Sequence, residues 1–398
     1  MEIWQIKMQS KKTILQFLCY APRIYSGFDK YILLLSKKII AQGYLPVIIY
    51  ADTIKNVPQI VEDFEAIGAK VELISSSKGI MLRNIWQLYT KYKPAIVHSH
   101  FVNLVKIVTV LFSIIFGARQ YISFHSTISL IPSSEYKKKK GILKRYLLLV
   151  YFRYLYCFSK GIFTVSKAIL NQFLDFADKK KSNKVQKLYL GVEIIKNERT
   201  KMELREFLQL PQNKILLCNI SAIEHIKGLD VLCEAIALLK TKYKLTNFAC
   251  CHLGGLRADN EQSRIYRDSI YDLCEKMNIK DVMFWLGHRN DIGEILSAFD
   301  IYVHPSRMEG LGLVNVEAGI QSLPLVGSNV GGIPEVVQEG ENGLLFDSDN
   351  AEQLAERLYK LINDEKLRAE MGQKSFEIVI ENFSIETQTE KLINLYFE

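Results

Sequence analysis

The stretch Ser-Arg-Met-Glu-Gly-Leu-Gly-Leu-Val-Asn-Val-Glu over residues 306–317 carries the most information about the fold of this chain. It follows a short apolar run that ends in proline, which predicts a β-strand stopped at that point. The residues after Gly312 predict a helix that ends before the Leu-Pro pair at 323–324. Glu309 is therefore expected in a strand-to-helix loop, and Glu317 about one turn into the helix.

A loop of this kind suits a phosphate group. The first residues of a helix carry free backbone N–H groups, and here they lie between two carboxylates. Carboxylate oxygens accept hydrogen bonds from sugar hydroxyls. The arrangement fits a nucleotide-diphospho-sugar, with the diphosphate on the amides, the ribose on one acid and the hexose on the other. The donor-binding positions expected in the loop are Gly310, Leu311, Gly312 and Leu313.

The two acids resemble the Glu-seven residues-Glu signature of retaining glycosyltransferases of the GT-B fold, family-four type (glycosyl transferases group 1). The resemblance implies that Glu309 contacts the donor sugar and that Glu317 contacts the ribose. Taken alone, two solvated acids around a helix start would give the same spacing in many α/β proteins.

A lysine lies in the expected loop after the first strand of the second half, where Ser221 to Gly228 includes Lys227. An ammonium group there can neutralise a diphosphate that becomes the leaving group. The segment matches the Lys-Gly element of the family, which implies that role for Lys227. The family usually has an arginine five positions earlier, and this chain has Ala222. Arg289 or His225 could compensate, and the sequence leaves open whether donor binding is weakened.

In the first half, residues 26–30 occupy the place of a glycine-rich element of the family, and Gly27 keeps the backbone approach to the donor phosphate feasible. His125 follows a predicted strand and matches the active-site histidine of the family, which implies contact with the donor sugar or with charge near the anomeric carbon. A lone histidine there is otherwise more often structural. We expect His98 and His100 to line the pocket, although the three histidines could also hold zinc on spacing alone.

The length of 398 residues exceeds what one hydrophobic core usually serves, so two domains are expected. Short apolar strands alternate with longer helical patterns, which predicts parallel sheets built of βαβ units. With the resemblance, the fold class is α/β of the GT-B type, two Rossmann-like doubly wound domains facing across a cleft. We expect an acceptor-binding domain over 1–192 and a nucleotide-sugar-binding domain over 193–383. By resemblance, the predicted helix 384–398 returns to the first domain.

Apolar runs place the strands. Those of the first half are expected at 13–20, 46–50, 71–74, 95–98, 120–124, 161–165 and 187–190, and those of the second half at 214–220, 248–253, 282–286, 301–303 and 325–327. No Asp-x-Asp is expected in a loop that follows a strand. We therefore expect a reaction that needs no metal and no cofactor.

Charge divides the chain unevenly. Residues 1–192 hold 29 Lys and Arg against 10 Asp and Glu, whereas the remainder holds 22 against 33. The basic half includes Lys137–Arg153, where cations are interleaved with Leu, Tyr and Phe. Such a segment fits peripheral contact with an anionic membrane. A merely solvated basic face is the alternative. Nucleic acid is not an expected partner, because no nucleic-acid-binding motif accompanies the charge.

The seven cysteines are odd in number, fall mostly in apolar patterns and lack zinc spacing, which predicts reduced thiols in a cytoplasmic protein. The N-terminal residues lack the apolar stretch of a secretory signal. The most apolar run, residues 107–116, is too short to span a bilayer, and its length predicts a buried helix. We expect a cytoplasmic chain with peripheral contact at the inner face of the cell membrane.

The function expected from these features is a retaining, metal-independent transfer of a hexose-type sugar from a nucleotide-diphospho-sugar, with a UDP-sugar favoured. The acceptor expected is a glycan or lipid-linked molecule of cell-surface polysaccharide biosynthesis, such as lipopolysaccharide or capsule. Two alternatives stay open. One is an epimerase or hydrolase acting on a nucleotide-sugar with the same fold, and the other is a non-catalytic binding or scaffold subunit.

Overall fold

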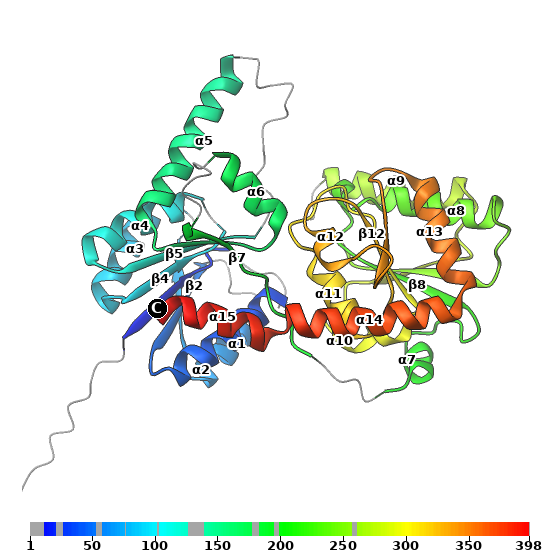
Figure 1. Ribbon diagram of the computed structural model, residues 1–398, viewed down its shortest axis with the longest axis horizontal. Coiled ribbons are helices and arrows are strands. Elements are labelled where there is room, and N and C mark those ends of the chain that lie inside the picture. Colours follow the sequence, from blue (N-terminus) through cyan, green and yellow to red (C-terminus); the bar gives the residue numbers. More distant parts are fainter. Residues whose placement is uncertain are drawn as a thin grey trace, which may run out of the picture. The chain divides into compact units, whose positions relative to one another are not determined.

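The computed structural model describes residues 12–20, 27–52, 58–75, 77–101, 103–125, 139–176, 183–194, 199–256 and 261–397. The chain divides into two compact units, which Figure 1 colours along the sequence. The first unit runs to Val165 and includes Leu170–Leu188 and the chain from Thr389 onward; the second consists of Ser166–Ile169 and Tyr189–Gln388. The chain therefore passes from one unit to the other after Val165, Ile169, Leu188 and Gln388.

In the first unit, the described residues form a seven-stranded parallel sheet in the order β3-β2-β1-β4-β5-β6-β7. Its strands are β1 (Thr13–Phe17), β2 (Leu45–Ala51), β3 (Lys70–Ile74), β4 (Ile96–Ser99), β5 (Arg119–Phe124), β6 (Gly161–Thr164) and β7 (Val185–Lys187). The helices that connect them are α1 (Gly27–Ala41), α2 (Pro58–Ala66), α3 (Lys78–Tyr92), α4 (Asn103–Phe116), α5 (Lys139–Phe158) and α6 (Lys167–Phe176). In Figure 1, α1 and α2 lie below this sheet, and α5 and α6 lie above it.

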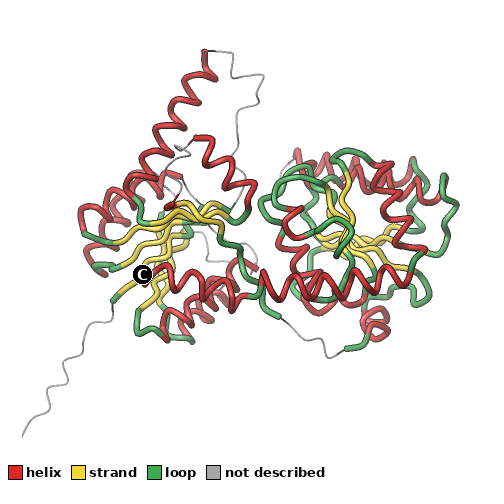
Figure 2. The backbone as a smooth tube through the Cα atoms, viewed as in Figure 1, coloured by secondary structure: helices red, strands yellow, loops and turns green. Residues whose placement is uncertain are grey.

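The second unit has, within its described residues, a six-stranded parallel sheet in the order β10-β9-β8-β11-β12-β13. Its strands are β8 (Ile215–Ile220), β9 (Phe248–Leu253), β10 (Met283–Gly287), β11 (Ile301–His304), β12 (Leu325–Ser328) and β13 (Gly343–Phe346). Its helices are α7 (Lys201–Phe207), α8 (Leu229–Thr241), α9 (Glu261–Lys276), α10 (Ile292–Ile295), α11 (Leu313–Ile320), α12 (Ile333–Val336), α13 (Ala351–Asn363) and α14 (Glu365–Phe383). Figure 2 shows these helices around a central sheet.

The predicted alternation of strands and helices is confirmed, with three differences. The strand expected at 187–190 lies earlier, as β7, because Leu188 and Leu190 are buried outside the ladder. The strand β13, with the sequence Gly-Leu-Leu-Phe, was not predicted. The helix over 107–116 exists as α4, but the expectation that it is buried is wrong for its outer side, where Ile107, Leu111, Ile114 and Ile115 are exposed.

The last helix, α15 (Ile385–Phe397), packs on the first unit, in agreement with the expected return of the chain. The hydroxyl of Tyr396 is fully buried there and accepts a hydrogen bond from the Gln16 amide at 3.0 Å. The Tyr121 hydroxyl donates to the carbonyl of Leu395 at 2.8 Å. Polar contacts as well as apolar ones therefore fix α15 on β1 and β5.

Within the described part of the chain, no helix is both long and apolar enough to cross a bilayer. The seven cysteines are free thiols, and Cys157 is the exposed one.

Candidate functional site

Two loops of the second unit meet at one edge of its sheet. The strands β8 and β11 are parallel neighbours, so the loops that follow them emerge side by side. The β8 loop contains the short 3₁₀ helix His225–Lys227, and the β11 loop contains Glu309. The Lys227 Nζ lies 2.7 Å from Glu309 Oε2, although 82 positions separate the two residues in sequence. The structure thus brings together Lys227, the residue predicted to bind the diphosphate, and Glu309, the residue predicted to bind the sugar.

Close backbone packing holds the two loops in this arrangement. Gly228 has φ +68°, and a Cβ on it would lie 2.0 Å from the carbonyl oxygen of Pro305. The Arg307 amide donates to the carbonyl of Ile226 at 2.8 Å. Only glycine allows this contact, which explains the Gly that follows Lys227.

The side chain of Arg307 adds a second connection between the loops. Its guanidinium donates to both carboxylate oxygens of Asp230 at 2.9 and 2.6 Å and to Asp349 at 2.6 Å. Sequence reasoning gave Arg307 no role, because nothing in the sequence shows that Asp230 at the start of α8 lies within its reach. A bidentate Arg-carboxylate pair is geometrically specific, so Arg307 keeps the two loops in register.

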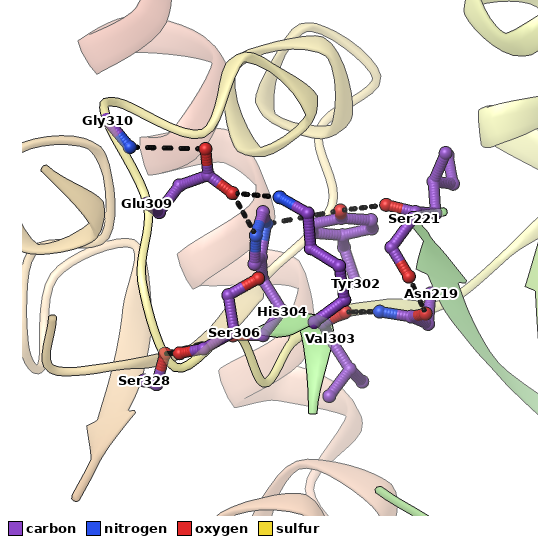
Figure 3. Close-up of polar contacts among 11 residues, drawn as sticks. Asn219, Ser221, Tyr302, Val303, His304, Ser306, Glu309, Gly310 and Ser328 are labelled. Carbon is purple, nitrogen blue, oxygen red and sulfur yellow. Dashed lines mark hydrogen bonds and ion pairs between the residues drawn. The ribbon is translucent and has the colours of Figure 1, made fainter. Parts of the chain in front are cut away.

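A histidine completes the surroundings of the Glu309 carboxylate. The His304 Nε2 lies 3.2 Å from Oε2, and the Gly310 amide donates to Oε1 at 3.2 Å (Figure 3). Burial by itself would raise the pKa of Glu309, but the hydrogen bond and charge of His304 and the charge of Lys227 outweigh it and hold that pKa well below its usual range. Glu309 is therefore ionised at physiological pH and acts as an acceptor, not as a proton donor.

His304 received no role from the sequence, although its position at the end of a strand, five residues before Glu309, was a usable signal. Its Nδ1 lies 3.4 Å from the hydroxyl of Tyr302. The Nε2–H therefore faces the carboxylate while the phenol closes the other side of the ring. Together, His304 and Tyr302 fix the orientation of the Glu309 carboxylate.

Behind Glu309, polar side chains join the ends of the strands β8, β9 and β11. The Asn219 amide donates to the carbonyl of Val303 at 2.8 Å, and its oxygen accepts from Ser221 at 3.1 Å and from His252 Nδ1 at 2.9 Å. Burial lowers the pKa of His252 to about 4, so this ring is neutral. The network ties β8, β9 and β11 into a rigid support for the loops.

The N-terminus of α11 lies next to Glu309, as predicted. Gly312 precedes the helix with φ +80°, and a Cβ there would lie 2.6 Å from Asn315 Nδ2 and 3.2 Å from Glu309 Cγ. Leu313 is the first helical residue, and Glu317 lies half-buried one turn further on. The predicted order of strand, loop and helix with an acid on each side is therefore present.

Two buried polar side chains beside this helix start were not predicted. Asn315 is fully buried, and neither its amide nitrogen nor its oxygen has a hydrogen-bond partner within the described residues. The same holds for the hydroxyl of Ser306, which is 1% exposed. Unpaired buried polar atoms are uncommon in proteins, so their presence here indicates that the loop has a functional role.

The glycines at 331 and 332 approach the same loop. A Cβ on Gly331, which has φ +55°, would lie 1.9 Å from the carbonyl oxygen of Glu309, and one on Gly332 would lie 2.2 Å from that of Gly310. In the structure, Gly331 and Gly332 allow the backbone of the Glu309 loop to pack closely against them.

Arg289 lies in the loop after β10, where its guanidinium donates to both oxygens of Asp291 at 2.8 and 2.6 Å and faces the ring of Phe207. The His225 carbonyl accepts a hydrogen bond from Arg307. Neither observation assigns Arg289 or His225 to the place of the arginine that Ala222 replaces, so compensation by either stays a prediction.

In the first unit, Gly27 is the exposed first residue of α1, and Ser26 lies outside the described residues. Asp29 in the first turn of α1 is fully buried, and it accepts hydrogen bonds from the hydroxyls of Tyr20 and Tyr50, the latter at 2.7 Å. Asp29 is therefore occupied in anchoring α1, while the backbone at Gly27 is open.

The three histidines of the first unit form a connected chain, in which His98 and His100 are buried and His125 is half-buried. His100 Nδ1 lies 2.9 Å from His125 Nε2, and His100 Nε2 lies 3.0 Å from the Gln16 amide oxygen. His98 contacts the hydroxyls of Tyr396 and Ser123 at 2.5 and 2.7 Å. The ring nitrogens thus face protein groups, which argues against the zinc alternative.

This chain of contacts sets the protonation of His125. Since the Gln16 oxygen only accepts, His100 Nε2 carries a hydrogen, and its unprotonated Nδ1 accepts from His125 Nε2–H. Burial, together with neighbouring charges, lowers the pKa of His125 and of His100 well below the usual range. The remaining nitrogen of His125, Nδ1, is then a bare acceptor, and it has no partner among the described residues.

Within the described residues, no cluster of three or more His, Cys, Asp or Glu side chains could hold a metal ion. One expectation on this point is wrong: an Asp-x-Asp does follow a strand, as Asp347 and Asp349 come directly after the unpredicted β13. Asp349 is paired with Arg307 at 2.6 Å. Independence from metal stays a prediction.

Residues 200–377 match the family model for glycosyl transferases group 1. Over 239 residues the chain is 26% identical to N-acetyl-alpha-D-glucosaminyl L-malate synthase of Bacillus anthracis, covering 60% of this chain and 58% of that protein. It is 28% identical to poly(ribitol-phosphate) alpha-N-acetylglucosaminyltransferase of Staphylococcus aureus (strain COL), covering 46% of this chain and 36% of that protein. The matched regions thus span about a third to three fifths of these relatives.

Among solved structures, Anabaena Alr3699/HepE in complex with UDP is similar to this chain, with a TM-score of 0.78 at 18% identity, covering 96% of this chain and 98% of that one. The site on the edge of β8 and β11 falls inside the segment that the family model matches. The chain therefore has the GT-B fold of two Rossmann-like units, and its residues 200–377 match the family model for glycosyl transferases group 1.

Proposed function

We propose that the chain transfers a hexose-type sugar from a UDP-sugar to a glycan or lipid-linked acceptor of cell-surface polysaccharide biosynthesis, with retention of configuration and without a metal. The observation that carries this proposal is the contact of Lys227 with an ionised Glu309 beside the N-terminus of α11. A cation, an acid and free helix amides at one place suit a donor with a diphosphate and a hydroxylated ring.

In the proposed reaction, the bond between the anomeric carbon and the diphosphate oxygen breaks, and the diphosphate leaves with the electron pair. Lys227 and the amides near Leu313 stabilise the charge that develops on it. The acceptor hydroxyl bonds to the same face of the carbon, and its proton passes to the departing phosphate. Glu309 accepts hydrogen bonds from the sugar and stabilises positive charge on its ring, while Glu317 holds the ribose.

The names of the matched proteins support the choice of donor and acceptor. One relative is named an N-acetyl-alpha-D-glucosaminyl L-malate synthase, another a poly(ribitol-phosphate) alpha-N-acetylglucosaminyltransferase, and a structural neighbour was solved with UDP. His125 and Gly27 of the first unit keep the roles that the family resemblance implies. We also propose that the chain is cytoplasmic and that the segment 137–153 contacts anionic lipid at the inner face of the membrane.

Thermal-shift measurements with UDP-, GDP- and ADP-sugars test the donor, because a bound ligand raises the melting temperature by mass action. We expect stabilisation by UDP and by one UDP-sugar. Transfer to an acceptor is then followed by NMR of the anomeric proton, with and without chelator. Free sugar or an isomer in place of a retained glycoside would favour a hydrolase or epimerase. Absence of stabilisation by any nucleotide-sugar would favour a non-catalytic subunit.

A further inference from the structure

The outer side of α4 is apolar although it faces solvent. Ile107, Leu111, Ile114 and Ile115 are 39, 49, 51 and 57% exposed, and their spacing places them on one side of the helix. The one charged residue of α4, Lys106, is 2% exposed. A helix of a soluble domain normally turns polar residues outward, so this stripe needs a partner.

The stripe continues onto α3. The indole of Trp86 is 44% exposed and packs edge-on against Phe112 and Phe116 of α4, at ring distances of 5.4 and 5.2 Å. Leu82, one turn earlier on the same side of α3, is 42% exposed. The exposed side of α3 thus adds an aromatic and an aliphatic group to the same surface.

On its other side, α4 contacts α5. The Tyr154 hydroxyl donates to the carbonyl of Ile107 at 3.1 Å, and the ring of Tyr154 lies 5.3 Å from that of Phe158, which is 52% exposed. Further along α5, Tyr146 and Leu147 are 62 and 58% exposed. We call the outer sides of α3, α4 and α5 together the α3–α5 face. Figure 1 shows α5 projecting beyond the sheet of the first unit.

The charge of these helices has one sign. None of α3, α4 and α5 contains an Asp or Glu, whereas α3 contains Lys78, Arg83 and Lys91, and α5 contains Lys139, Lys140, Lys144, Arg145 and Arg153. Of these, Lys91 is paired with Glu72 of β3. Arg83 and Arg153 are exposed.

We propose that the α3–α5 face lies on an anionic lipid bilayer, with Trp86 and the α4 stripe at the boundary between headgroups and acyl chains. An anionic bilayer offers an apolar interior beneath a negatively charged surface. The exposed apolar side chains of this face match the first, and its basic residues match the second. A second copy of the chain would bring the same cations against each other, and a nucleic acid would leave the exposed Ile and Leu side chains without a partner. The proposal deepens the proposed membrane contact, extending it from segment 137–153 to two further helices, and is independent of the donor site.

Co-sedimentation with vesicles tests the proposal on the full chain. We expect binding to vesicles that contain phosphatidylglycerol and little binding to pure phosphatidylcholine. The double variant Leu111→Gln/Ile115→Gln should lose binding by about tenfold or more, because its apolar groups no longer enter the bilayer. The matched control is Ile265→Gln in α9 of the second unit, since Ile265 is 61% exposed and equally apolar. It should bind as the wild type does.

A second readout follows Trp86 itself. In a Trp4→Phe/Trp285→Phe background, the emission of Trp86 should shift to the blue with anionic vesicles and be quenched by brominated lipid. Equal binding of wild type and double variant, or no emission shift, would overturn the proposal. The proposal would also be overturned if light scattering showed a wild-type dimer that becomes a monomer in the double variant. Tight binding of nucleic acid by both the wild type and the double variant would overturn it as well. UDP-sugar stabilisation measured on the same samples separates failure of this proposal from failure of the sugar-transfer proposal.

Discussion

The Nζ of Lys227 lies 2.7 Å from Oε2 of Glu309, and this ion pair joins the loops that follow two neighbouring strands. Each group has its own part in the proposed reaction, the cation on the leaving diphosphate and the acid on the sugar. The pair also keeps each charge compensated in a partly buried place, where an isolated charge would be costly.

Replacement of Lys227 by alanine should lower kcat by about a hundredfold to a thousandfold, because the leaving group loses its cation. UDP affinity, measured by calorimetry, should fall as well. Lys240→Ala is the control, since Lys240 forms a comparable ion pair with Asp281 at 2.6 Å on the helix α8. Full activity of Lys227→Ala would contradict the assigned role.

Glu309→Gln separates charge from shape at the sugar position. We expect loss of transfer with nearly unchanged UDP affinity, because UDP lacks the transferred hexose that Glu309 is proposed to contact. An exposed glutamate of α13, replaced as Glu352→Gln, is the control. If Glu309→Gln bound UDP poorly and still transferred sugar from saturating donor, the residue would belong to nucleotide binding instead.

The lowered pKa of Glu309 also predicts how stability depends on pH. A carboxyl with a lower pKa in the folded than in the unfolded chain stabilises the fold above its unfolded pKa of about 4.3, and this contribution is lost as the pH falls below that value. The free energy of unfolding of wild type should therefore exceed that of Glu309→Gln most near neutral pH. The difference should shrink toward about pH 3. Urea denaturation of both proteins at the two pH values measures it, and a constant difference would contradict the assigned ionisation.

Gly228→Ala should destabilise the second unit by about 3 kcal/mol, because the added Cβ overlaps the Pro305 carbonyl and the positive φ adds strain. Gly340 is a matched control, with φ +78° and nothing within 4 Å of an added Cβ. Gly340→Ala should cost only the strain, about 1 kcal/mol. Equal losses for the two variants in thermal denaturation would show that close packing of the two loops is unimportant.

His100→Phe removes the acceptor that keeps the hydrogen on Nε2 of His125. If His125 acts on the donor through its bare Nδ1, kcat should fall by about a hundredfold while KM for the donor stays nearly constant. His100→Gln retains a hydrogen-bonding side chain and should recover part of the rate. A purely structural role would instead lower the melting temperature of both variants and leave their kcat alike.

The fold was largely predictable because its signals are local. Apolar runs, prolines and glycines marked all the strands of the second unit except β13, and the loop from His304 to Leu313 was recognised from its own residues. The position of Lys227 beside Glu309 follows from the strand order, in which β8 and β11 are neighbours, and no short stretch of sequence states that order.

What the sequence missed depends on tertiary contacts. Arg307 and Asn315 were visible in the quoted stretch, but their importance rests on Asp230 and on the burial of the amide. The outward apolar side of α4 was missed for a related reason. Apolarity all around a helix predicts burial, and only the packed structure shows that the side with Ile107, Leu111 and Ile115 is exposed.

The docking of Tyr396 on Gln16 and His98 has a consequence for biosynthesis. Gln16 lies in β1, near the start of the first unit, yet its hydrogen-bond partner Tyr396 is translated 380 residues later. While the ribosome translates the second unit, the surface of the first unit that α15 later covers stays exposed to water. A released chain that ends before Thr389 should therefore be more sensitive to protease in the first unit than in the second.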